Sequence, residues 1–356
     1  MARREYCALD GDHTMDGCDT MNGCYHIKES PEDFIVRELT TINPAREGSY
    51  SYWWMRKRSC NTIQAVESIA SLLGIPTNKV GFAGSKDKVA VTEQLISIDR
   101  KFEGRIKGFS HERISIEFAG RGDTPICFGE LKGNYFDVMV RKAQKKPATL
   151  RRFINYFGEQ RFGRNNAEAG KAVVKKDFRK AAEMMDKPAV KKALEERKTD
   201  YVGAIKKIPR ELLMMYIAAY QSLIWNRTAE EYIKEQMGGE GRAGCKDTDS
   251  LDNIQIPLVG FGTEYDDERA ERIIRRILDE EGVTERDFII RQLPEASAEG
   301  DSRWLFAEVK DLKIESVGCK KSEDKNKKNG KKSDYRLRFF LPKGCYATEM
   351  IRQMFG

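Results

Sequence analysis

The sequence predicts an α+β fold that is interrupted by a helical insertion. Three observations support this prediction: strand-like segments dominate up to about residue 164, a lysine-rich helical stretch follows, and a strand pattern returns near residue 335. A strand region, a block of helices and a second strand region are typical of helices inserted into an α+β core. The 356 residues are enough for two domains at roughly 150 residues each.

The first elements are predicted from composition and from helix-boundary signals. Residues 33–39 and 50–55 are rich in aromatic and β-branched residues, as strands are. Asn61 and Thr62 then precede apolar residues at helical spacing, and Gly74 and Pro76 follow the last of them. We therefore expect two strands and then one helix.

The next stretch predicts more strands. Residues 80–98 look like a strand, a glycine-containing turn and a second strand. Residues 114–118 and 135–140 alternate in polarity like a half-buried antiparallel pair. Residues 147–157 are expected to return to helix.

Beyond residue 164 the pattern becomes helical. Residues 167–198, 208–235 and 266–281 carry apolar residues at helical spacing. Residues 320–332 contain seven lysines and no apolar residue, which predicts a loop or linker that either contacts phosphates or is simply solvated. Residues 335–341 form another expected strand, followed by a Pro-Lys-Gly turn and a final helix.

Composition and charge exclude several classes of protein. Hydrophobic residues make up 40% and charged residues 33% of the chain, which is a globular composition. No apolar run approaches the roughly 18 residues of a membrane span, and the first residues lack the apolar core of a signal peptide. We therefore expect a cytoplasmic protein whose eight cysteines are reduced. The net charge of +7 permits a nucleic-acid partner without requiring one.

A metal site has little support in the sequence. Cys7, His13, Cys18, Cys24 and His26 lie close together, but no two cysteines have the short spacing of a structural zinc site. An irregular amino-terminal arm over residues 1–23 is the alternative. The chain has three histidines, so catalysis is expected to depend on carboxylates, lysines or thiols.

The segment from Gly81 to Gln94 is the most unusual stretch. Its glycines allow close approach of the backbone to a ligand, and Asp87 lies between Lys86 and Lys88, which would favour the ionised carboxylate if they are near it. Such an aspartate suits a nucleophile or a general base. The alternative is a hairpin in which Asp87 accepts turn hydrogen bonds.

A second unusual stretch runs from Asn155 to Asn166. Aromatic rings, amides and arginines alternate within it. Such a set can stack a base, read its edge and hold a phosphate. The end of a helix with core aromatic residues is the alternative.

These two stretches resemble the TruD family of RNA pseudouridine synthases. Further matching segments occur in the order of the family: residues 30–38, 60–62, 131–136 and 341–348. Residues 219–226 look like a helix that the family carries in its insertion. Together the core matches cover residues 24–166 and 334–356.

The resemblance implies a pseudouridine synthase catalytic domain with a mixed, mostly antiparallel sheet flanked by helices. It places this domain at residues 24–166 and 321–356, and a mostly helical TRUD insertion domain at 167–320. It also implies the reaction: isomerisation of a uridine in RNA, typically uridine 13 of tRNA, without cofactor or metal. The expected partner is therefore structured RNA, and no protein partner is implied.

The resemblance also implies roles for individual residues. Asp87 matches the catalytic aspartate and Lys28 its basic partner. Asn155 matches the amide that contacts the target nucleotide, and Phe157 the ring that stacks on the uracil. The remaining two matches are aromatic residues near the substrate, namely Phe34 and Tyr346, where Tyr346 is often Phe in the family.

Two other functions fit parts of the sequence. One is an RNA-binding protein that retains the fold without turnover, which the presence of Asp87, Lys28 and Asn155 disfavours. The other is a glycosidase with Asp87 as its nucleophile, and this would need a second acid such as Glu93 or Glu32. In the leading hypothesis a carboxylate acts at C1′ or C6 of the uridine, or assists elimination.

Overall fold

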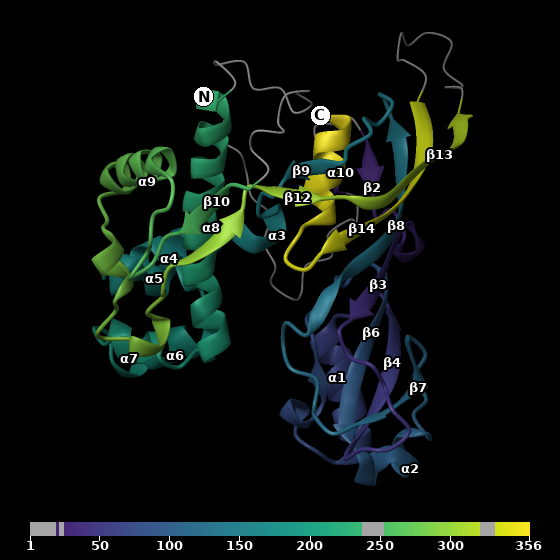
Figure 1. Ribbon diagram of the computed structural model, residues 1–356. Coiled ribbons are helices and arrows are strands. Elements are labelled where there is room, and N and C mark those ends of the chain that lie inside the picture. The colour runs from purple at the N-terminus through teal and green to yellow at the C-terminus, as the bar shows by residue number, and fades with distance from the viewer. Residues whose placement is uncertain (1–18, 21–24, 237–252, 321–331) are drawn as a thin grey trace. The chain divides into compact units, whose positions relative to one another are not determined.

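The computed structural model describes residues 19–20, 25–236, 253–320 and 332–356 (Figure 1). Contacts divide the chain into two compact units. Among the described residues, those between 19 and 153 form the sheet unit together with 307–347 and 351–356, and residues 154–306 and 348–350 form the helical unit.

The sheet unit is built on one large mixed sheet. Its strands have the order β1-β2-β8-β3-β6-β4-β7, with β14 and β13 added beside β8 and β5 added beside β6. The strands are β1 (Asp19–Thr20), β2 (His26–Ile27), β3 (Phe34–Thr40), β4 (Tyr50–Arg58), β5 (Gly81–Phe82), β6 (Val91–Asp99), β7 (Ile114–Gly122), β8 (Leu131–Ala143), β13 (Lys310–Lys320) and β14 (Lys332–Pro342).

The sheet is mostly antiparallel, as predicted. Strands β3 and β6 form a parallel pair, and the other pairs in the sheet are antiparallel. The expected pairing of residues 114–118 with 135–140 is wrong, because β7 pairs with β4 whereas β8 pairs with β3, β14 and β2. Alternation of polarity identifies the buried face of a strand but not its neighbour.

Helix α1 (Thr62–Leu73) confirms the first helix prediction in detail. The side chain of Asn61 accepts a hydrogen bond from the Gln64 N–H at 2.7 Å, which caps the amino end. Gly74 ends the helix in the left-handed conformation at φ 67°. The buried face of the helix, which includes Val66, Ile69 and Leu73, shares a hydrophobic core with residues of β4 and β6.

Residues 147–157 are not helical, so that prediction is wrong. They contain strand β9 (Arg152–Ile154), which forms a two-stranded sheet with β12 (Phe306–Glu308). Burial alternates with a period of two, since Phe153, Asn155 and Phe157 are buried while the residues between them are half-buried. This period is typical of a strand, and partners outside the segment satisfy its backbone: the Val309 N–H donates to the Arg151 carbonyl.

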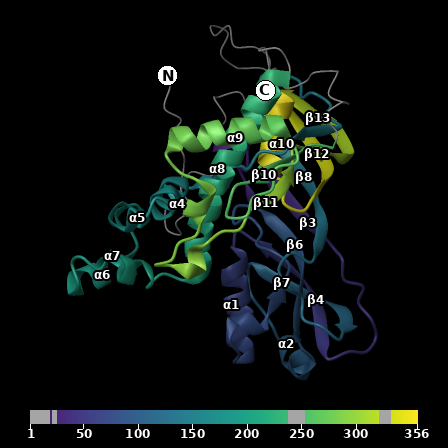
Figure 2. The ribbon, with the colours of Figure 1, turned by 60° about the vertical axis from the view of Figure 1, so that its left-hand side comes forward.

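The helical unit confirms the predicted helices in the middle of the chain. The stretch 167–198 corresponds to α4 (Asn166–Val174), α5 (Phe178–Met185) and α6 (Pro188–Glu196), and the stretches 208–235 and 266–281 correspond to α8 (Arg210–Gln236) and α9 (Glu268–Glu281). Two further short helices, α3 (Glu159–Phe162) and α7 (Tyr201–Ile205), were not predicted. Figure 2 shows α4 and α9 beside the long helix α8. Gly170 allows α4 to approach α8 closely, because a Cβ atom at this position would lie 2.0 Å from the Tyr216 carbonyl oxygen. A small sheet of β10 (Gln255–Leu258) and β11 (Asp301–Trp304) completes the unit.

The carboxyl-terminal prediction is also confirmed. Strand β14 covers the expected residues 335–341, and helix α10 (Ala347–Phe355) follows it. The sheet unit further includes the short helix α2 (Glu103–Ile106). No helix in the described part of the chain is both long and apolar enough to cross a bilayer. The lysine-rich loop lies outside the described residues at 321–331, as does most of the amino-terminal arm.

Candidate active site

Three of the predicted site residues meet in the sheet unit. The Lys28 ammonium lies 3.5 Å from an Asp87 carboxylate oxygen, and the side chains are 8% and 27% exposed, respectively. The same ammonium lies over the ring of Phe34, 4.5 Å from its centroid. The arrangement is a nearly buried cation beside a carboxylate that a substrate can reach.

The loop that carries Asp87 joins β5 and β6. These strands pair as an antiparallel hairpin, so the hairpin of the alternative interpretation exists, and its aspartate forms an ion pair with Lys28. Within the loop the Lys86 N–H donates to Thr62 Oγ1 at 2.9 Å. The Gln94 side-chain amide donates to the Gly84 carbonyl at 3.0 Å. The loop is therefore tied to α1 and β6 through its backbone.

A buried ion pair gives the loop a further attachment. Lys86 pairs with Glu38 of β3, and their side chains are 6% and 0% exposed. The second oxygen of Glu38 accepts the Leu95 N–H at 3.3 Å. Breaking such a pair leaves an uncompensated buried charge, so the pair strongly favours this loop position. Neither Glu38 nor the role of Lys86 was predicted from the sequence, because the contact joins residues 48 positions apart.

Lys28 itself lies on a short segment between β2 and the 3-10 helix at Pro31–Asp33. Its backbone has φ 60°, a left-handed conformation that costs a non-glycine residue roughly 1–3 kcal/mol. Such a conformation persists only when surrounding contacts impose it.

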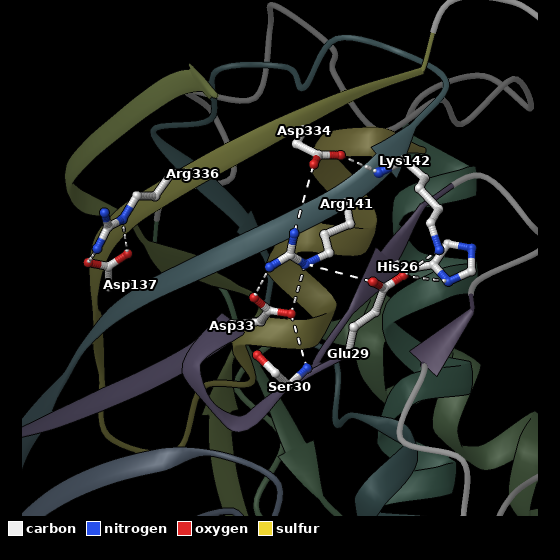
Figure 3. Close-up of polar contacts among 9 residues, drawn as sticks. All are labelled: His26, Glu29, Ser30, Asp33, Asp137, Arg141, Lys142, Asp334 and Arg336. Carbon is white, nitrogen blue, oxygen red and sulfur yellow. Dashed lines mark hydrogen bonds and ion pairs between the residues drawn. The ribbon is translucent and has the colours of Figure 1, made fainter. Parts of the chain in front are cut away.

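Figure 3 shows the contacts that hold this segment. The Arg141 guanidinium donates two hydrogen bonds to the Asp33 carboxylate, at 2.9 and 2.6 Å, and the Ser30 N–H donates to the same carboxylate at 3.1 Å. Glu29, which directly follows Lys28, accepts a hydrogen bond from Lys142 at 2.7 Å. The residues that follow Lys28 are thus anchored to β8.

Two further predicted site residues meet in the helical unit. Asn155 and Phe157 are 6% and 8% exposed. The Arg303 guanidinium donates to the Asn155 carbonyl at 2.9 Å and to its side-chain oxygen at 2.6 Å, and it lies over the Phe157 ring at 4.1 Å. Trp225 meets the same ring edge-on at 5.7 Å. The amide and the ring are therefore held by a single arginine.

Asn226 of α8 fixes the backbone of Phe157. Its side-chain oxygen accepts the Phe157 N–H at 2.9 Å, and its amide donates to the Phe157 carbonyl at 2.9 Å. This paired contact gives a structural role to Asn226, the last residue of the segment 219–226 that was singled out in the sequence. Arg303, in contrast, carries no sequence signal, since an isolated arginine in a strand is unremarkable until its partners are known.

Tyr346, the sixth predicted residue, belongs to the sheet unit. It is half-buried and directly precedes α10 at the amino-terminal cap position. The cysteines Cys7, Cys18 and Cys24 and the histidine His13, which were considered as metal ligands, lie outside the described residues. In the ranges that are described, no three histidine, cysteine or acidic residues gather in a metal-binding group.

Three lysines in α4 and in the turn that follows it have partners within the chain. Lys171 forms an ion pair with Glu281 at 2.6 Å, and Lys175 donates to the Glu281 carbonyl at 3.0 Å. Lys176 pairs with Asp287 at 3.0 Å. These contacts favour a structural role for the three lysines over contact with the phosphates of an RNA.

Comparison with known proteins gives a consistent match. The family model of tRNA pseudouridine synthase D (TruD) matches residues 15–193, 184–243 and 246–354. The tRNA pseudouridine synthase D of Aquifex aeolicus is 29% identical, over 92% of this chain and 97% of that protein. A Nanoarchaeum equitans protein assigned the same activity is 30% identical, over 92% of this chain and 98% of its own.

The fold is also similar to a solved structure. A crystal structure of a Methanosarcina mazei protein assigned to TruD superposes with a TM-score of 0.67 and 26% sequence identity. The match covers 95% of this chain and 95% of the other. Sequence and fold therefore agree along nearly the whole chain.

Proposed function

Because the chain belongs to the TruD family of tRNA pseudouridine synthases, enzymes that isomerise uridine to pseudouridine, we propose that it acts on uridine 13 of tRNA with Asp87 as the catalytic carboxylate. The observation that carries this proposal is the ion pair of Asp87 with the nearly buried Lys28. The cation is held by the anchored segment next to it, and the carboxylate retains 27% exposure for a substrate.

The reaction requires what this pair offers. The bond from N1 to C1′ breaks, a bond from C5 to C1′ forms, the proton of C5 leaves and N1 gains a proton. An ionised carboxylate serves the reaction at C1′, at C6 or by assisting elimination. Lys28 orients the carboxylate through the 3.5 Å ion pair.

The other predicted residues are assigned to binding the uridine. A uridine within folded RNA must leave its stack, at a cost of a few kcal/mol. We assign Phe157 to stacking on the uracil, which returns roughly 1–3 kcal/mol, and Asn155 to contacting the nucleotide. Phe34 and Tyr346 are assigned aromatic contacts near the substrate. Phe34 is 1% exposed and lies under Lys28, so the same ring also supports the cation.

The domain limits belong to the same proposal. A catalytic domain at residues 24–166 and 321–356 and an insertion domain at 167–320 follow the family pattern. Placement in the cytoplasm, where tRNA is available as a partner, is part of it as well.

Nucleotide-resolution mapping of pseudouridine tests the substrate. Transcripts of the tRNA set are incubated with the protein, and one transcript is also prepared with cytidine at position 13. We expect pseudouridine at position 13 in the unaltered transcripts and none in the altered one. Pseudouridine at another position would overturn the assignment of uridine 13 while leaving the reaction intact.

Variants of Phe157 test its role. Phe157→Tyr keeps a stacking face and is expected to retain most activity, whereas Phe157→Ala should weaken formation of the flipped state by roughly 1–3 kcal/mol. Equal activity of the two variants under subsaturating enzyme would contradict the stacking role.

A further inference from the structure

Lys57 is a lysine inside the core of the sheet unit. It is 0% exposed and lies at the end of β4, two residues after the buried Met55 on the same face of the strand. Its neighbours Arg56 and Arg58 point to the exposed side. Lysine is almost never fully buried without a specific partner, so this position needs an explanation.

Three backbone carbonyls receive the Lys57 ammonium. It donates to the Cys60 carbonyl at 2.7 Å, to the Asp87 carbonyl at 2.8 Å and to the Lys86 carbonyl at 3.2 Å. An ammonium has three N–H donors, so these contacts use its full capacity. Two of the three acceptors belong to the loop that carries the proposed catalytic carboxylate, and one belongs to Asp87 itself.

We propose that Lys57 is a positioning residue for the reaction: its ammonium binds the backbone of Lys86 and Asp87 and thereby fixes the origin of the Asp87 side chain. This inference rests on the proposed role of Asp87. Two lysines thus position Asp87: Lys28 orients its side chain, and Lys57 fixes its backbone. A shift of about 1 Å in a reacting group costs on the order of 100-fold in rate.

The attachment of the loop to Lys57 depends on pH, because the amine must be charged to donate three hydrogen bonds. Burial lowers the pKa of Lys57 to about 8, while the titratable groups around it act in both directions: Cys60 and Asp87 raise the pKa and Lys86 lowers it. The three carbonyls favour the charged form, so the ammonium predominates at neutral pH. Above pH 8 the neutral amine has two donors for three acceptors and no charge, so the attachment of the loop to Lys57 weakens.

The experiment compares Lys57→Met with Met55→Ala in single-turnover assays at saturating enzyme. Met55 lies on the same face of the same strand, so its truncation disturbs the core without removing a bond to the loop. We expect the Lys57→Met rate to fall by about 100-fold with unchanged affinity for tRNA. The Met55→Ala rate should stay near that of the wild type at temperatures where both variants are folded.

Wild-type protein supplies a second measurement that needs no variant. With tRNA bound at every pH, its single-turnover rate should fall by about tenfold per pH unit well above pH 8, as the charged fraction of Lys57 falls. A flat rate up to pH 9.5, or a Lys57→Met rate equal to that of Met55→Ala, would overturn the role of Lys57. If wild-type protein forms no pseudouridine on any tRNA, the proposed function fails instead, so the two failures are distinguishable.

Discussion

The two regions that carry the predicted site residues are held in place by different kinds of contact. In the sheet unit, charged groups fix the Asp87 loop: the ammonium of Lys57 binds its carbonyls, and Lys86 pairs with the buried Glu38. In the helical unit, the neutral amide of Asn226 holds Phe157 through two backbone hydrogen bonds, and the cation that binds Asn155 is the guanidinium of Arg303. Unlike a lysine, an arginine is not deprotonated in proteins. We therefore expect the first region to respond to pH and the second to be insensitive to it.

The largest expected loss of stability in this comparison concerns the support of Lys28. Arg141→Met leaves the carboxylate of Asp33, whose side chain is 4% exposed, without its cation, and should lower the free energy of unfolding by about 3–5 kcal/mol. Arg58→Met removes an exposed pair with Glu32 and should change stability far less, because solvent screens such a pair. Denaturant unfolding measures both. Equal losses would mean that the charged network does not hold the segment.

Lys57 links pH to stability in the opposite direction from activity. Its folded pKa of about 8 lies below the ordinary 10.5, so between these values the unfolded chain binds more protons and folding becomes more favourable as pH rises. The free energy of unfolding of wild type relative to Lys57→Met should rise by about 1 kcal/mol per pH unit from pH 8 to 10. A constant difference over this interval would show that Lys57 is not a buried ammonium.

A substitution of Gly170 tests whether close packing of α4 against α8 stabilises the helical unit. In Gly170→Ala the new methyl group meets the Tyr216 carbonyl, which cannot move away easily, and we expect a loss of about 2–3 kcal/mol. Gly104→Ala is the matched control, because its Cβ would meet open space in a helix and should be neutral or stabilising. Thermal unfolding that is unchanged in Gly170→Ala would contradict the close contact of α4 with α8.

The smallest expected loss comes from the amide contact. Asn226→Ala removes both hydrogen bonds to Phe157, with an expected loss of about 1–2 kcal/mol in stability and weaker binding of tRNA. Because no charge is involved, the ratio of variant to wild-type affinity should stay constant from pH 6 to 9. A ratio that changes with pH would break the distinction between the two regions.

Local patterns predicted much of the fold. The cap residues Asn61 and Gly74 fixed the limits of α1 before any tertiary contact was known, and the helical spacing of Ile273, Ile274 and Ile277 identified the buried face of α9. The sequence did not predict which strands pair with each other, because β7 pairs with β4 and not with β8. The helix predicted for 147–157 is wrong because Phe153, Asn155 and Phe157 follow the period of two that is typical of a strand.

The candidate site was predictable only in part. Motif resemblance pointed to Asp87, Lys28, Phe34, Asn155, Phe157 and Tyr346. The sequence does contain a signal for Lys57, because alternation with Met55 places it on the inward face of its strand. Arg303 had none, because its contacts with Asn155 span 148 positions and depend on tertiary structure.

The proposed role of the Asp87 carboxylate in the reaction can be tested with one pair of variants. Asp87→Asn and Asp137→Asn each neutralise an ion-paired aspartate of the sheet unit whose side chain is 27% exposed. At Asp137 burial raises the pKa, but hydrogen bonds and charge from Arg336 and Arg338 outweigh it and hold the pKa below its ordinary value, so Asp137→Asn removes a charge.

The measurement is single-turnover formation of pseudouridine in tRNA, with binding of tRNA determined in parallel. We predict that Asp87→Asn abolishes product while it binds tRNA nearly as well as the wild type, and that Asp137→Asn retains the reaction. Pseudouridine formed by Asp87→Asn at a rate near that of the wild type would contradict the proposed role of Asp87.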